Sequence, residues 1–82
     1  MTRTATEQAI STIWAAELGR SDIEPESDFF GLGGGSLQML NMLFHVCRCL
    51  GVEIPPGMLF EDATLRGFAR NVDEARAGSL NR

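Results

Sequence analysis

The 82-residue chain contains no lysine, no tyrosine, one histidine and two cysteines. Its formal net charge is −4, so it lacks the basic surface with which proteins bind nucleic acid or anionic membranes. We therefore expect neither nucleic acid nor a membrane as a partner. No basic-then-apolar leader opens the chain, and no apolar run is long enough to span a bilayer. The sequence predicts a soluble, cytoplasmic protein.

The cysteines, Cys47 and Cys49, stand two positions apart and point to different sides if the segment is helical. They are then too poorly aligned to bridge each other, so we interpret them as reduced thiols. With His45 they form a His-x-Cys-x-Cys string, but metal ligands on one helix favour spacings of three or four residues. We interpret the string as structural and expect no metal.

The first half of the chain predicts one helix and a long loop. Thr4-Ala5-Thr6-Glu7 fits a capping box, and apolar residues follow it at helical spacing as far as Leu18. We expect this helix to run from about Thr4 to Leu18, with Gly19 as its C-terminal stop. The stretch from Gly19 to Gly35 has no sustained period, and loops of this length are usually functional. Its apolar residues are expected to anchor it across the core; they are Ile23, Phe29, Phe30 and Leu32.

A second helix is expected to begin at Ser36 or Leu37 and to end at Leu50, before Gly51. Its apolar surface is wider than one core face requires. One apolar stripe on this helix is expected to pack into the core, and it consists of Met39, Leu43, Val46 and Leu50. A second stripe is available either for further packing or for a partner, and it consists of Leu37, Leu40, Phe44 and Cys47.

The last third of the chain predicts a short helical turn at Met58-Leu59-Phe60 and a final helix capped by Thr64. We expect the final helix to fray from about Ala77. Since no segment alternates like a strand, the predicted fold is all-α: a small four-helix bundle with three longer helices, one short helix and a long loop between the first two. Residues 1–82 are expected to form a single domain with an ordered core at about 5–76.

Ser36 follows three glycines and stands at the start of the second helix. From the residues alone, one interpretation is an ordinary N-cap, whose hydroxyl turns inward to a backbone N–H. The other is a hydroxyl left outside for an incoming enzyme, at a helix N-terminus that favours an attached anion. The glycines favour the second interpretation, because they cost entropy and are useful where another backbone or a bulky substrate approaches closely.

The segment Asp28-Phe29-Phe30-Gly31-Leu32-Gly33-Gly34-Gly35-Ser36-Leu37 resembles the core motif of phosphopantetheine carrier domains. It is most similar to that of the peptidyl carrier proteins, or thiolation domains, of nonribosomal peptide synthesis. Leu50-Gly51-Val52-Glu53-Ile54-Pro55 and Leu59-Phe60-Glu61-Asp62-Ala63-Thr64-Leu65 resemble later segments of the same family. The resemblance covers nearly the whole chain and implies an acyl-carrier-protein-like fold and a role in antibiotic biosynthesis or other secondary metabolism.

Two departures refine this resemblance. Fatty-acid acyl carriers have an acidic second helix, whereas here no Asp or Glu occurs from Gly31 to Val52, which favours peptidyl carriers with apolar docking. Gly35 stands where peptidyl carriers often have His or Asp, so that position supplies no polar side chain here.

The resemblance implies that a phosphopantetheinyl transferase uses coenzyme A to attach 4'-phosphopantetheine covalently to Ser36, with Gly34, Gly35 and Leu37 flanking the site. The arm then carries an aminoacyl or peptidyl group as a thioester. An adenylation enzyme or domain loads it, and condensation, tailoring or thioesterase partners follow. The carrier is not itself an enzyme, so no catalytic residue is assigned, and we expect a monomer. The residues expected to contact partners are Leu37, Leu40, Phe44, Met58 and Phe60.

Other interpretations remain open at this point. One is an acyl carrier of a polyketide or related pathway, and another is a helical interaction module that is never modified. An enzyme with Ser36 as nucleophile is disfavoured, because His45 would lie about 14 Å along the same helix. The length and Met1 suggest a free-standing carrier, although an excised module of a larger synthetase has the same appearance.

Overall fold

The computed structural model describes residues 4–80, and the side chains as far as Gly78. The two ends of the predicted 1–82 domain therefore lie outside the described residues. The helices are α1 (Ala5–Leu18), α2 (Ser36–Leu50), α3 (Gly57–Glu61) and α4 (Leu65–Leu80). Within residues 4–80 the strand-like pairing is limited to one isolated bridge, between Asp28 and Thr64. The predicted all-α fold is confirmed, with three longer helices and one short helix.

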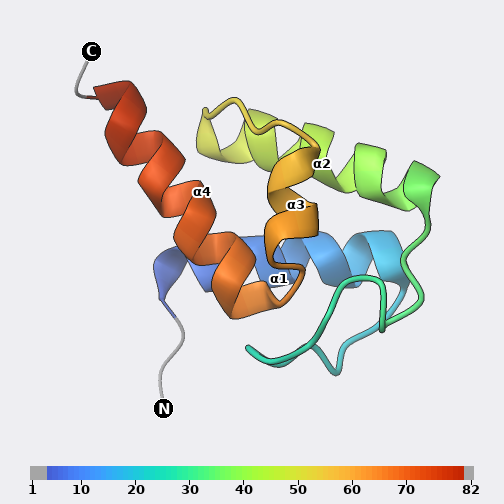
Figure 1. Ribbon diagram of the computed structural model, residues 1–82. Helices are drawn as coiled ribbons and strands as arrows, with labels where there is room; N and C mark the ends of the chain where they lie inside the picture. Colours follow the sequence, from blue (N-terminus) through green and yellow to red (C-terminus); the bar gives the residue numbers. More distant parts are fainter. Residues whose placement is uncertain (1–3, 81–82) are drawn as a thin grey trace.

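The helices pack with α1 at the centre of the contacts, since it touches both α2 and α4, while α3 packs on α4. In Figure 1, α1 and α2 run side by side in opposite directions, and α4 crosses α1 near the start of α4. The loop from Gly19 to Gly35 connects the end of α1 to the start of α2 at one end of this pair. No helix within residues 4–80 combines the length and apolarity needed to cross a membrane.

Local capping signals place the ends of the helices where the sequence predicts them. At the start of α1, Thr4 Oγ1 accepts from the Glu7 N–H at 3.0 Å, and Glu7 Oε1 accepts from the Thr4 N–H at 3.3 Å. Gly19 and Gly51, with φ of 66° and 64°, end α1 and α2 in the left-handed region that glycine adopts without strain. The last helix differs from the prediction, because α4 continues past Ala77 to Leu80.

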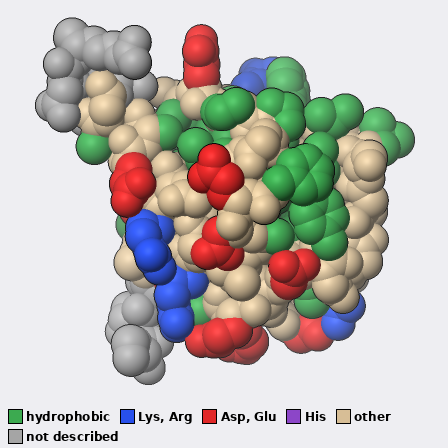
Figure 2. Space-filling model, in the orientation of Figure 1, with side chains coloured by type: hydrophobic (Ala, Val, Ile, Leu, Met, Phe, Trp, Pro, Cys, Tyr) green, Lys and Arg blue, Asp and Glu red, His purple; other side chains and the backbone are tan. Residues whose placement is uncertain are grey.

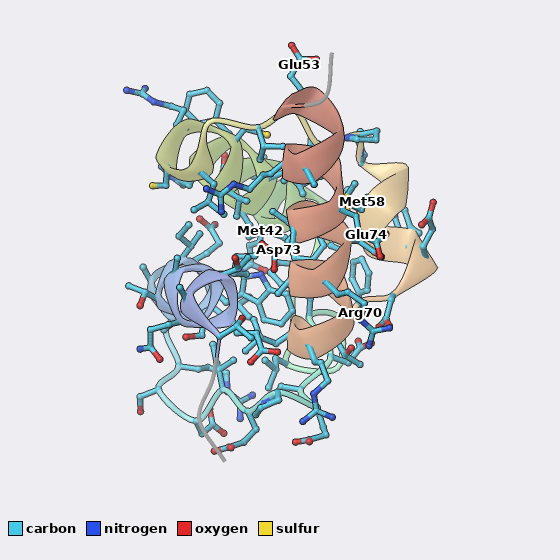
Figure 3. The ribbon with its side chains drawn as sticks, turned by 90° about the vertical axis from the view of Figure 1, so that its left-hand side faces the viewer. Met42, Glu53, Met58, Arg70, Asp73 and Glu74 are labelled. Atoms are coloured by element: carbon cyan, nitrogen blue, oxygen red, sulfur yellow. The ribbon has the colours of Figure 1, made fainter. Side chains whose placement is uncertain are left out.

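The core is built around Trp14, which is fully buried. The ring of Phe29 meets Trp14 edge-on at 5.2 Å, and the ring of Phe68 stacks on it at 6.2 Å. From α2, Met42 is fully buried, whereas the predicted core residue Leu50 is only half-buried. Figure 3 shows Met42 between α2 and α4. The remaining predicted core residues of α2 are buried, and they are Met39, Leu43 and Val46.

The long loop is held against the start of α4. The Phe29 N–H donates to the Ala63 carbonyl and the Leu65 N–H donates to the Ser27 carbonyl, both at 2.9 Å. Ile23 and Phe29 are buried as predicted, whereas the other two expected anchors are half-buried; these are Phe30 and Leu32. The loop therefore reaches the glycine run before Ser36 along a fixed path.

The start of α4 depends on Asp62 and Thr64. The Asp62 carboxylate accepts from the Thr64 hydroxyl at 2.7 Å and from its N–H at 3.0 Å, and Thr64 Oγ1 accepts from the Gly67 N–H at 3.1 Å. These hydrogen bonds hold the pKa of Asp62 below its ordinary value, the Thr64 hydroxyl contributing most. A Cβ at position 67 would overlap the Asp62 carboxylate, which explains a glycine inside a helix.

Candidate functional site

Ser36 is the first residue of α2, and its side chain is exposed. The N-cap position belongs to Gly35, whose φ of −101° and ψ of −179° are extended. The Ser36 hydroxyl forms no hydrogen bond with any residue from 4 to 80. The interpretation of Ser36 as an ordinary N-cap is therefore wrong, because the cap is one residue earlier and the hydroxyl faces solvent.

The first backbone N–H groups of α2 also have no hydrogen-bond acceptor among residues 4–80. The first bond inside the helix runs from the Met39 N–H to the Gly35 carbonyl at 2.8 Å. The N–H groups of Ser36, Leu37 and Gln38 precede it and find no acceptor within residues 4–80. By contrast, threonine side chains accept from the first turns of α1 and α4. The exposed hydroxyl thus stands beside free N–H groups and the positive end of the helix dipole, which suit a phosphodiester.

Within residues 4–80, no basic side chain is hydrogen-bonded to the Ser36 hydroxyl. His45 lies further along α2, where its ring meets the ring of Phe44 at 5.7 Å. Among the described residues, no three His, Cys, Asp or Glu side chains are grouped so as to hold a metal ion. Cys47 and Cys49 are both free thiols. The Ser36 hydroxyl is open to another molecule, and none of residues 4–80 forms a hydrogen bond that would make it more nucleophilic.

The three glycines before Ser36 have three different environments. Gly33 has a φ of 99°, which favours glycine. The Gly34 N–H donates to the Phe29 carbonyl at 3.0 Å, and a Cβ on Gly34 would lie 2.6 Å from Phe29 Cδ2. A Cβ on Gly35 would meet only Gln38 Oε1, at 3.8 Å. Gly33 thus serves the backbone conformation and Gly34 serves the packing of Phe29, whereas Gly35 has neither constraint and lies beside open space.

Gln38 is a site residue that was not among those predicted from the sequence. Its Oε1 accepts from the Gly35 N–H at 2.9 Å, and its Nε2 donates to the Glu17 carbonyl of α1 at 3.5 Å. Glutamine three residues after an N-cap is the second half of a capping box, so the position of Gln38 carried a signal. The expectation of a serine cap hid that signal, because it shifted the register by one residue.

Large apolar side chains lie exposed on α2 and α3. The exposed fractions are 72% for Leu37, 52% for Leu40, 56% for Phe44 and 66% for Phe60. Figure 2 shows hydrophobic side chains gathered at the upper right, over the region where α2 and α3 lie. Leu40 and Phe44, for which packing and partner contact were both open, are therefore not needed by the core. Met58 differs, because it is half-buried and packs against the core.

Two contacts shape this apolar surface. The Phe60 ring stacks on the Phe30 ring of the long loop at 5.4 Å, with 10° between their planes. The guanidinium of Arg48 lies over the Phe44 ring, 5.5 Å from its centroid. Exposed apolar side chains therefore lie along α2 from Leu37 to Phe44 and on α3 at Phe60, whose ring stacks on the half-buried Phe30.

Comparisons with known proteins agree on one family. Residues 8–72 match the family described as "Phosphopantetheine attachment site". Over 64 residues, 78% of this chain and 1% of the relative, the sequence is 41% identical to tyrocidine synthase 3 of Brevibacillus parabrevis. The chain spans 7%, 6% and 2% of the length of three further curated relatives.

Two solved structures share the fold over nearly their whole length. One is the peptidyl carrier protein in a complex of the phosphopantetheine transferase Sfp with coenzyme A, with a TM-score of 0.84 and 32% identity over 89% of this chain and 95% of that chain. The other is BlmI, a type-II acyl-carrier-protein from Streptomyces verticillus involved in bleomycin biosynthesis, with a TM-score of 0.81 and 33% identity over 85% of this chain and 84% of that chain. The family match and these likenesses identify the chain as a member of the phosphopantetheine carrier-domain family, of the peptidyl carrier type found in nonribosomal peptide synthetases.

Proposed function

We propose that Ser36 Oγ is the atom to which 4'-phosphopantetheine is attached, and that the chain carries an aminoacyl or peptidyl group between biosynthetic enzymes. The observation that carries this proposal is the exposed, unpartnered hydroxyl at the start of α2, where no side chain accepts from the first helical N–H groups. The free N–H groups beside it would stabilise the negative charge of the phosphodiester. Gly35 supports the proposal further, since a Cβ there would meet only one side chain.

In the proposed attachment, Ser36 Oγ forms a bond to the phosphorus of the phosphopantetheine half of coenzyme A. The bond from that phosphorus to the rest of the pyrophosphate breaks, and adenosine 3',5'-bisphosphate leaves. The hydroxyl proton passes to a base of the transferase, because Ser36 has no base of its own among the described residues. Once attached, the group supplies a thiol on a long flexible arm, where cargo is held as a thioester at high effective concentration near each partner.

The exposed apolar side chains on α2 and α3 are the proposed contact surface for partner enzymes, namely the transferase, the adenylation enzyme or domain, and condensation, tailoring or thioesterase partners. Leu37, next to Ser36 and 72% exposed, is the first contact that an approaching enzyme would meet. Large exposed apolar patches on a small protein commonly mark interaction sites. Met58 contributes less, because the core already covers part of it.

We also infer that the chain is a cytoplasmic, monomeric carrier without enzyme activity of its own. The lack of any base hydrogen-bonded to Ser36 among the described residues supports the last point. The buried core runs from Ile10 to Val72, which supports the predicted domain core at about 5–76. An acyl carrier of a polyketide or related pathway is the second candidate, favoured by the likeness to BlmI.

Intact-mass measurement with coenzyme A and a broad-specificity phosphopantetheinyl transferase tests the attachment. We expect one phosphopantetheine increment on the wild type and none on Ser36→Ala. Ser21→Ala is a matched control, because Ser21 is an exposed serine in the long loop. Loss of the increment in Ser21→Ala, or no increment on the wild type, would contradict the proposal, and the second result would favour an unmodified interaction module.

Loading of the modified protein separates the two kinds of carrier. An adenylating enzyme that places an amino acid on the arm would support a peptidyl carrier. Loading only by an acyltransferring enzyme would favour the acyl carrier. Both reactions are followed by the same intact-mass measurement.

A further inference from the structure

The long loop between α1 and α2 is closed at its base by the side-chain amide of Gln38. Its Oε1 accepts from the Gly35 N–H, at the end of the loop, at 2.9 Å. Its Nε2 donates to the carbonyl of Glu17, in the last turn of α1, at 3.5 Å. One half-buried side chain therefore joins the last turn of α1 to the residue that precedes Ser36.

A second side chain, that of Arg20, contacts the same loop at Leu32, before the glycines. Arg20 Nη1 donates to the Leu32 carbonyl at 3.4 Å, and two hydrogen bonds to the Asp22 carboxylate, at 2.9 and 2.7 Å, orient the guanidinium. The hydrogen bond from Arg20 is the main cause that lowers the pKa of Asp22. Because this pair is exposed and the contact with Leu32 is long, solvent weakens the tie. Arg20 contacts the loop at Leu32, before the three glycines, whereas Gln38 binds Gly35, the last of them.

The glycine run makes such a tie necessary. Glycine has the largest backbone freedom of any residue, so three in a row would let the start of α2 fray. Gly34 is fixed by its bond to the Phe29 carbonyl and by contact with the Phe29 ring. The Gly35 N–H is bound by Gln38 and by no other group among residues 4–80. The Gly35 carbonyl accepts from the Met39 N–H in the first turn of α2, and Gln38 holds the N–H side of this last flexible residue before Ser36.

We propose that Gln38 is a positioning residue, which restricts the backbone before Ser36 in the free protein and so presents the hydroxyl to the transferase in one arrangement. This inference rests on the proposed attachment at Ser36. If only a fraction of the carrier molecules hold Ser36 in the arrangement that the transferase binds, the apparent affinity for the transferase falls in proportion to that fraction. Loss of Gln38 should therefore raise KM for the carrier and leave kcat nearly unchanged, because the enzyme-bound arrangement is the same.

The test compares Gln38→Ala, Gln38→Glu and the control Asn41→Ala in the transferase reaction with coenzyme A. Asn41 is an exposed polar residue on the same helix. We expect Gln38→Ala to raise KM about fivefold, as for the loss of one hydrogen bond. Gln38→Glu keeps the acceptor for the Gly35 N–H, so it should restore most of the wild-type KM. Asn41→Ala should have the wild-type KM, and far-UV circular dichroism checks that every variant is folded at the assay temperature.

Amide hydrogen exchange of Gly35, measured by NMR without the transferase, is the second readout. It separates positioning in the free protein from direct contact between Gln38 and the enzyme. We expect exchange to rise severalfold in Gln38→Ala and to stay near wild type in Gln38→Glu and Asn41→Ala. Unchanged Gly35 exchange in Gln38→Ala would overturn the inference, and so would a lower kcat at unchanged KM. If the wild type is not modified at all, the proposed attachment fails, while Gly35 exchange still decides whether Gln38 holds the loop.

Discussion

At the scale of single residues, Gly34 and Gly35 show that neighbouring glycines in one motif have different physical roles. Gly34 lies against the ring and the carbonyl of Phe29, and a Cβ there would come within 2.8 Å of that carbonyl oxygen. Gly35 occupies the N-cap of α2 in an extended conformation that any residue adopts. The resemblance to peptidyl carriers singled out Gly35, but the physical reason for the difference lies in the packing of the loop.

The same substitution at both positions should therefore give different results. Gly34→Ser should lower the free energy of unfolding by about 1–3 kcal/mol, because Phe29 has no room to move within the core. Gly35→Ser should leave it unchanged or raise it by a few tenths of a kcal/mol, since serine is a favourable N-cap. Urea denaturation of the two variants measures both values. Equal losses in the two variants would contradict the separate roles.

Asp62 gives a pH dependence at the same scale. Its pKa is below the ordinary value in the folded protein, so its ionised form stabilises the fold above about pH 4. That contribution is lost as the pH falls from about 4 through the lower folded pKa. We expect Asp62→Asn to be less stable than the wild type at pH 7 by about 0.5–1 kcal/mol, a value kept small by solvent screening.

The difference between wild type and Asp62→Asn should close as the pH falls below about 4, because the wild-type carboxyl is then neutral as well. Thermal unfolding at a series of pH values measures it. Glu74→Gln on the exposed side of α4 is the control, and it should not reproduce the pH-dependent gap. A gap that stays constant down to pH 2 would show that the charge of Asp62 is not the cause.

At the scale of elements, α2 has one face for the core and one for solvent. Met42 is fully buried, whereas Leu40, two residues earlier, is 52% exposed. We expect Leu40→Gln to change the free energy of unfolding by no more than about 0.5 kcal/mol, as for an exposed position. The same variant should raise KM severalfold in the transferase or loading reaction, because an apolar contact with the partner is lost.

Arg70→Gln is the matched control for this prediction, since Arg70 is exposed on α4 (Figure 3). It should leave KM unchanged. A large loss of stability in Leu40→Gln would assign Leu40 to the packing of the bundle. An unchanged KM with every partner would remove Leu40 from the proposed contact surface.

The elements also show how far the sequence alone predicts this protein. The ends of α1 and α2 were predictable because their signals are local: the capping box at Thr4 and the left-handed glycines at 19 and 51. Leu37 was predicted to be exposed beside Ser36, whereas Leu40 and Phe44 were predictable as a stripe but not as exposed residues. Periodicity could not decide between packing and exposure, because that depends on where α3 and α4 lie.

The sequence did not predict the roles of residues whose structure depends on a contact with a distant part of the chain. Met42 is fully buried whereas Leu50 is half-buried, a difference that depends on how the elements pack and that the periodicity of α2 does not contain. The reason for Gly67 lies in the carboxylate of Asp62, five residues earlier and outside the helix. The role of Gln38 involves the Glu17 carbonyl in another helix. No local pattern contains these partners.

At the scale of the whole molecule, the buried residues form one cluster that includes residues from all four helices and the loop. Trp14, the single tryptophan, is completely buried within it. We expect one cooperative unfolding transition, as for most small domains. Trp14 fluorescence and the far-UV circular dichroism of the helices should therefore give the same midpoint in urea. Two separate midpoints would mean that part of the bundle unfolds independently of the aromatic core.

The two cysteines of α2 have a practical consequence for experiments on the carrier. Cys49 is exposed and Cys47 is half-buried, so the unmodified protein already presents one accessible sulfur to alkylating reagents. The modified protein would present a second one, at the end of the arm. Counts of reactive thiols must therefore subtract this background, and air oxidation can link two copies through Cys49. Replacing Cys49 by serine would leave the arm as the main target for selective labelling, which would make the cargo position directly measurable.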